Sequence, residues 1–132
     1  MNSRKVLLIE DNLMNMELAT DLLETAGFQV LKAGRADEGI ALAVAQQPDI
    51  ILMDIALPGM DGLEATRRLK QDARTARIPI VALTASAMRG DDNKALIAGC
   101  CGHIAKPIDT RRFAKTVTAF IEKERTSADG TA

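Results

Sequence analysis

The sequence predicts an α/β fold, a doubly wound parallel sheet of five strands with five helices on its two sides. Short, continuous apolar runs recur along the chain and alternate with stretches whose apolar residues repeat at helical spacing. The runs lack alternating polar residues, which is typical of strands that helices cover on both faces. With 132 residues, 47% of them hydrophobic, the chain suffices for one domain with a single core.

The first part of the chain alternates strand and helix. Apolar runs at 4–9 and 28–33 are predicted strands. The helix between them is expected to end at Gly27, which tolerates a left-handed backbone, and the next helix ends before Pro48. The expected buried faces of these two helices are Leu18, Leu22, Leu23 and Ala26, and then Ala36, Ile40, Ala43 and Val44.

The middle of the chain continues the alternation. The run at 49–54 is the third predicted strand, and the turn signal Pro58-Gly59 follows it. A third helix then runs from about 61 to 70, with Asp61 placed to cap its first turn. The run at 78–85 is the fourth strand.

The last part of the chain completes the pattern. A fourth helix is expected at roughly 87–98, and a short fifth strand at 102–107 stops at its proline. The fifth helix has the apolar face Phe113, Val117, Phe120 and Ile121. We assign residues 1–124 to one domain and expect 125–132 to be a flexible tail, because the tail has nothing to bury.

Composition narrows the possible functions. The net charge of −1 gives no bulk attraction to nucleic acids or anionic lipids, and no stretch reaches the roughly 18 apolar residues of a membrane span. The N-terminus also lacks the apolar region of a signal peptide, so we expect a cytoplasmic protein. Adjacent Cys100 and Cys101 would close a strained ring, so a structural disulfide is not expected, and the single histidine leaves too few ligands for zinc.

Polar residues stand where the predicted strands end. Glu10 and Asp11 follow the first strand, Asp54 ends the third, Thr84 the fourth, and Lys106 the fifth. Since the carboxyl ends of parallel strands meet at one edge of the sheet, these five side chains are expected to converge.

The expected cluster has a specific chemistry. Converging carboxylates raise one another's pKa unless a cation neutralises them, and oxygen ligands suit a hard cation such as Mg²⁺. Magnesium keeps positions open for phosphate oxygens, which indicates phosphoryl chemistry. Asp54 is then the nucleophile that forms an aspartyl phosphate, and Lys106 and Thr84 are donors to the phosphoryl oxygens.

With these residues identified, the chain resembles the CheY-like receiver domains of two-component response regulators, most closely the single-domain DivK-type regulators. The resemblance covers about residues 4–122 and is carried by LLIEDNLMN, DIILMDIALPGMDG, IPIVALTASAMRGD and HIAKPI. It implies strand order 2-1-3-4-5 and a cis Lys106–Pro107 bond. It also implies Mg²⁺ bound by Glu10, Asp11, Asp54 and the carbonyl of Ala56.

The resemblance further implies how such a protein signals. A histidine kinase or histidine phosphotransfer protein would phosphorylate Asp54, and Thr84 and His103 would form a switch between two states. The expected output surface, read by a protein partner, is the face of the fourth helix, fifth strand and fifth helix around Lys94, Ile97, His103 and Ile108. We expect a monomer or weak dimer that is not an enzyme, although it assists its own phosphorylation.

Dephosphorylation is expected to be slow, because Ala56 and Ser86 border the path of the hydrolytic water and neither orients it well. Ala56 also argues against a haloacid-dehalogenase-type phosphatase, which needs a general acid at that position. A receiver module cut from a hybrid histidine kinase stays an alternative. The start at Met1, close to the first strand, favours a stand-alone chain, and no room is left after Glu122 for a DNA-binding domain.

Overall fold

The computed structural model describes residues 4–55, 62–84, 98–106 and 108–130. Its centre is a five-stranded parallel sheet in the order β2-β1-β3-β4-β5, which confirms the predicted strand order. The strands are β1 (Lys5–Ile9), β2 (Gln29–Ala33), β3 (Ile50–Asp54), β4 (Ile80–Thr84) and β5 (Gly102–Ala105).

Four helices lie within the described residues: α1 (Leu13–Thr25), α2 (Ala36–Gln46), α3 (Gly62–Gln71) and α5 (Phe113–Gly130). The structure therefore describes four helices rather than the five that the sequence predicts, because the helix expected at 87–98 falls almost entirely outside the described ranges. The backbone of α5 stays helical to Gly130, past the expected domain end at residue 124, while the flexibility expected of the tail stays a prediction. No helix in the described ranges is both long enough and apolar enough to cross a bilayer.

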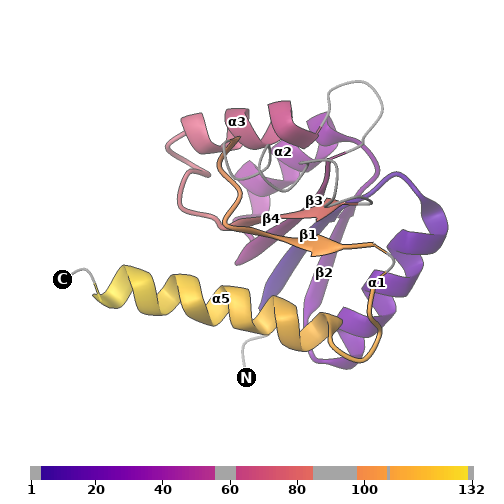
Figure 1. Ribbon diagram of the computed structural model, residues 1–132. Coiled ribbons are helices and arrows are strands. Elements are labelled where there is room, and N and C mark those ends of the chain that lie inside the picture. Colours follow the sequence, from indigo (N-terminus) through magenta and orange to yellow (C-terminus); the bar gives the residue numbers. More distant parts are fainter. Residues whose placement is uncertain (1–3, 56–61, 85–97, 107, 131–132) are drawn as a thin grey trace.

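The helices cover the sheet on both faces (Figure 1): α2 and α3 lie on one side, and α1 and α5 lie on the other. Successive residues of a strand point to opposite faces, so each strand contributes to two hydrophobic clusters. Leu7 and Ile9 of β1 pack with residues of α2 and α3, whereas Val6 and Leu8 pack with residues of α1 and α5. This two-sided burial explains why the strands read as continuous apolar runs.

The two cysteines follow the same alternation. Cys100 packs in the cluster under α2 and α3, and Cys101 packs against the cluster under α1 and α5. Neither cysteine forms a disulfide, as the sequence predicts. Burial raises the pKa of the Cys100 thiol, and its sulfur lies 3.8 Å from the Thr66 hydroxyl.

The buried face of helix α1 agrees in part with the predicted one. Of the predicted residues, Leu23 is buried and Leu22 packs against the same cluster, whereas Leu18 is 40% exposed and Ala26 is exposed beyond the helix end. The other buried residues are Met16, Ala19 and Thr20. The prediction was wrong for Leu18 because Leu13, Met14 and Leu18 place apolar side chains on the outer side of the helix as well. Apolar spacing alone therefore does not select one face, and packing on the sheet makes the selection.

Because Leu23 is buried and Leu18 is exposed, replacing each leucine by alanine should destabilise the protein to different extents. Leu23→Ala should lower the free energy of unfolding by about 2–5 kcal/mol, because it leaves a cavity in the core. Leu18→Ala should cost less than about 1 kcal/mol, since the side chain is largely in solvent already. Urea denaturation of both variants measures the difference, and equal losses would contradict the assigned face.

Candidate functional site

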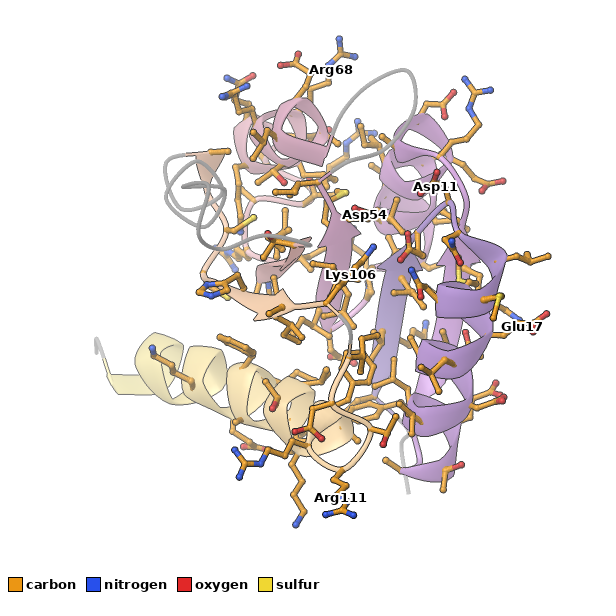
Figure 2. All side chains as sticks on the ribbon, turned by 45° about the vertical axis from the view of Figure 1, so that its right-hand side comes forward. Asp11, Glu17, Asp54, Arg68, Lys106 and Arg111 are labelled. Atoms are coloured by element: carbon orange, nitrogen blue, oxygen red, sulfur yellow. The ribbon has the colours of Figure 1, made fainter. Side chains whose placement is uncertain are left out.

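The polar cluster forms at the carboxyl edge of the sheet. Asp54 is the last residue of β3 and is 4% exposed, and Glu10 directly follows β1 and is 2% exposed. Lys106 directly follows β5, and Figure 2 shows its side chain pointing toward Asp54. Three residues that are far apart in sequence therefore meet at one edge, as the strand pattern predicts.

Backbone hydrogen bonds fix the residues that follow the strands. The N–H of Glu10 donates to the carbonyl of Ala33 over 3.0 Å, and the N–H of Lys106 donates to the carbonyl of Thr84 over 2.8 Å. Each bond extends the pairing of two neighbouring strands by one residue. The positions of Glu10 and Lys106 are thus set by the sheet itself rather than by a free loop.

The Lys106 ammonium lies between the two buried carboxylates. Its Nζ is 2.7 Å from Glu10 Oε1 and donates a hydrogen bond to Asp54 Oδ2 over 3.1 Å. A buried carboxylate without such a partner would be strongly destabilising. Lys106 therefore makes it possible for an acid to end a fully buried strand.

One ammonium does not balance the acids completely. Burial, followed by the interaction with Asp54, raises the pKa of Glu10 to about 7, although Lys106 opposes the shift. Burial by itself would lower the pKa of Lys106, but the hydrogen bond to Glu10 and the charge of Asp54 outweigh it, so that this pKa is raised. Three carboxylates, those of Glu10, Asp11 and Asp54, converge near this one ammonium, so the site has an excess of negative charge.

The acids fit a hard divalent cation. Glu10, Asp11 and Asp54 each present a carboxylate oxygen, and these oxygens lie within 4.8 Å of one another. Asp11 is exposed, so the cluster opens to solvent on that side. An all-oxygen donor set with a solvent-facing side is typical of Mg²⁺, which retains water ligands. The excess negative charge supplies the electrostatic reason for a cation.

Gly62 supports the backbone behind the cluster and is a residue that the sequence reasoning missed. A Cβ at this position would lie 2.4 Å from the carbonyl oxygen of Asp54 and 2.5 Å from Cα of Ile55. The N–H of Gly62 also donates to the carbonyl of Ile55 over 3.2 Å. The first turn of α3 therefore rests directly on the end of β3, which only a residue without a side chain permits. Its position just after the Pro58-Gly59 turn was the available signal.

The remaining predicted residues have different placements. Thr84 is fully buried at the end of β4, and His103 is exposed on β5. The structure brings Glu10, Asp11, Asp54 and Lys106 together. The predicted positions outside the described residues are Ala56, the helix cap Asp61, Ser86, Lys94, Ile97 and Pro107.

Comparisons with known proteins are consistent with this geometry. Residues 6–118 match the family described as response regulator receiver domain. The polar-differentiation response regulator DivK of Brucella ovis is 40% identical over 119 residues, which are 90% of this chain and 97% of that protein.

Two solved structures of receiver domains are similar to this chain in sequence and fold. One is the receiver domain of a sensor histidine kinase from Pseudomonas aeruginosa, with a magnesium ion coordinated in its active site cleft. It is 33% identical, with a TM-score of 0.85 over 92% of this chain and 99% of that one. Another comes from the co-crystal structure of the Saccharomyces cerevisiae histidine phosphotransfer signaling protein Ypd1 and the receiver domain of its downstream response regulator Ssk1. It is 28% identical, with a TM-score of 0.79 over 88% of this chain and 87% of that one.

The close approach of Gly62 to the backbone of Asp54 and Ile55 can be tested by substitution. Gly62→Ala should cost about 1–3 kcal/mol of stability through overpacking, although glycine to alanine within a helix ordinarily stabilises. In the Gly62→Ala variant, the largest chemical-shift changes should occur at the amides of Asp54 and Ile55. Gly34→Ala is the control, because a Cβ there would have no neighbour within 4 Å. Shift changes confined to α3 would contradict the proposed support of β3.

Proposed function

Because the chain belongs to the response regulator receiver domain family, we propose that Asp54 accepts a phosphoryl group from a histidine of a kinase or phosphotransfer protein. In this proposal Glu10, Asp11 and Asp54 hold Mg²⁺, with the carbonyl of Ala56 as a further ligand. The observation that supports it best is the placement of Lys106 between buried Glu10 and Asp54, with Asp11 beside them. The protein would act in the cytoplasm as a monomer or weak dimer.

The chemistry follows from the side chains that surround Asp54. A carboxylate oxygen of Asp54 attacks phosphorus, a P–O bond forms, and the P–N bond breaks with its electron pair leaving to the imidazole. Bound Mg²⁺ supplies neutralisation of the phosphoryl charge. Lys106 already lies 3.1 Å from Asp54 Oδ2, so its ammonium is within reach of an incoming phosphoryl oxygen. The hydroxyl of Thr84, at the end of the next strand, would donate a hydrogen bond to another phosphoryl oxygen.

The alternatives are less well supported. This chain lacks the general acid that a haloacid-dehalogenase-type phosphatase needs, because the position two residues after Asp54 is Ala56. A receiver of a hybrid histidine kinase shares the site, and one such kinase receiver is 33% identical. The DivK relatives are more similar in sequence, at 40% identity, and the chain spans 97% of their length. We therefore favour a DivK-like response regulator over a kinase module.

The phosphoryl donor should dock over the start of α1. Leu13 and Met14 are 73% and 80% exposed, and they follow Asp11 closely along the chain. Leu18 adds a third exposed apolar side chain one turn further along the helix. Apolar side chains gathered beside a reactive site are typical of a protein contact. The similar Ssk1 receiver was crystallised with a phosphotransfer protein, which supports a docked donor here.

The output surface remains the one that the sequence predicts, the face of the fourth helix, β5 and α5. Of its residues, His103 is exposed and Ile108 is half-buried, while Lys94 and Ile97 lie outside the described ranges. In this proposal Thr84 moves toward the phosphoryl group, and His103 turns into the space that it leaves.

The assignment of the phosphoacceptor has a direct test. Incubation with acetyl phosphate and Mg²⁺ should phosphorylate the wild-type protein, and EDTA should abolish the reaction, because the clustered acids need the cation. Asp54→Asn should take up no phosphate, and Asp37→Asn, on α2, should react normally. Phosphorylation of Asp54→Asn, or a reaction unaffected by EDTA, would refute the proposal.

The docking surface can be tested separately from the chemistry. Replacing Leu13 and Met14 by glutamine should slow phosphorylation by a protein donor at least about tenfold, since it removes an apolar contact worth about 1.4 kcal/mol or more. Phosphorylation by acetyl phosphate should be unchanged, because the small donor needs no docking surface. Equal slowing with both donors would place these residues in the site rather than in the interface.

The switch role of His103 predicts a response on β5. Phosphorylation should shift the amide signals of Ile104 and Ala105, because the ring of His103 turns into the space that Thr84 leaves. His103→Tyr should keep this shift, and His103→Ala, which has no ring to turn, should reduce it. Equal shifts in His103→Ala and in the wild type would show that His103 is not part of the switch.

A further inference from the structure

A shallow groove lies where the end of α1 meets the beginning of α5. It has a volume of about 350 Å³, and its lining consists of Ala26, Ala114, Lys115, Thr118 and Ala119. Figure 2 shows Arg111, in the turn just before α5, far below Asp11 of the acidic cluster. The groove is therefore separate from the proposed metal site, and it shares no residue with the proposed docking surface of the phosphoryl donor.

The groove forms because one flank of α5 carries small side chains. The helix buries Phe113, Val117 and Ile121 in the core, and beside them Ala114 and Thr118 are half-buried. Side chains of this size do not fill the space between two helices. The hydroxyl of Thr118 already donates to the carbonyl of Ala114 over 2.9 Å, so its hydrogen is not available to a ligand. The floor of the groove therefore suits an apolar group.

The start of α5 has an excess of positive charge. Arg111 and Arg112 directly precede the helix, Lys115 is its third residue, and all three are exposed. In the described part of the chain none of the three forms an ion pair, and the first turn of α5 contains no acid. The acid next to them in sequence, Asp109, accepts a hydrogen bond from the N–H of Arg111 over 3.0 Å.

These cations do not stabilise the fold. The beginning of a helix is the positive end of its dipole, so basic side chains there are unfavourable and acidic ones are favourable. Arg111, Arg112 and Lys115 stand at this end without a carboxylate partner among the described residues. A partner that brings negative charge to this end of α5 would offset both the dipole and the mutual repulsion of the cations.

The shape of the groove selects a protein helix as that partner. Small-molecule sites enclose most of their ligand, whereas this groove is open, since Ala26, Lys115 and Ala119 are exposed. Its lining side chains are small, so the projecting apolar side chain has to come from the partner. A surface that inserts into a membrane instead exposes large apolar side chains of its own. The lining also contains no aromatic residue on which a nucleic-acid base would stack.

We propose that this groove binds an acidic amphipathic helix of a partner protein. A leucine or a side chain of similar size from that helix occupies the space between Ala26, Ala114 and Ala119. Carboxylates on the neighbouring turns of the partner helix pair with Lys115 and Arg111. The apolar contact supplies affinity, and the cations select against basic helices. The phosphoacceptor takes no part, so the groove stands separately from the proposed function.

Nuclear magnetic resonance with a synthetic helix tests the proposal on the full chain. The probe is an acetylated and amidated peptide of about 18 leucine, alanine and glutamate residues, with its leucines on one face. It should cause saturable shifts at the amides of Ala26, Ala114 and Ala119, with a dissociation constant on the order of 0.1–1 mM. The same peptide with lysine in place of every glutamate should cause none.

The titration has three outcomes that would overturn the proposal. One is equal binding of the acidic and the basic peptide, and another is the absence of a saturable shift with the acidic one. The third is a shift of the same amides by phosphatidylglycerol bicelles and not by the acidic peptide, which would assign the groove to a lipid surface instead.

Charge reversal at Lys115 separates binding from stability. Lys115→Glu should weaken binding of the acidic peptide at least about threefold, because a pairing becomes a repulsion. The free energy of unfolding should stay unchanged or rise, since an acid near the beginning of a helix interacts favourably with the dipole. Lys123→Glu is the control, because it makes the same change on exposed α5 surface outside the groove lining. Equal weakening in both variants, or none in Lys115→Glu, would refute the site.

Filling the groove tests the apolar contact. Ala119→Leu should weaken binding of the acidic peptide at least about tenfold, because the added side chain occupies the space that the partner's leucine needs. The free energy of unfolding should change little, since Ala119 is exposed. Ala41→Leu, at an exposed position of α2, should bind like the wild type. Wild-type affinity in Ala119→Leu would show that the groove does not receive a side chain.

Discussion

The structure depends on burying two carboxylates side by side, Glu10 and Asp54, together with one lysine. Neither acid is stable in that position alone, because a charge removed from water needs a partner. The partner comes from β5, the strand at the far edge of the sheet, and it reaches across β4 to β3 and β1. Only a long, flexible cationic side chain spans that distance, which accounts for a lysine at position 106.

The sheet determines where such chemistry is possible. Every residue of β3 and of β4 is buried, so a polar side chain is accommodated only where a strand ends. The parallel arrangement brings all five ends to one edge, and the backbone pairing continues for one residue beyond β1 and β5. The covering helices contribute as well, since the first turn of α3 contacts the carbonyl of Asp54. The same packing that stabilises the core therefore positions the site.

Helix α1 combines two roles. Its buried side packs into the core through Met16, Ala19, Thr20 and Leu23. Its exposed side carries Leu13, Met14 and Leu18, and the first two of these follow Asp11 of the acidic cluster closely along the chain. In the proposed function, the helix that covers the sheet therefore also contacts the phosphoryl donor.

The sequence by itself determined the parallel α/β class, the five strands, and the convergence of Glu10, Asp54 and Lys106. Each of these follows from local patterns: unbroken apolar runs, and a polar residue where each run stops. The strand order came from family resemblance rather than from the pattern. Tertiary structure alone decided which face of α1 is buried, because its apolar residues surround the helix. It also revealed the contact of Gly62 with Asp54, since such a contact depends on how separate elements approach each other.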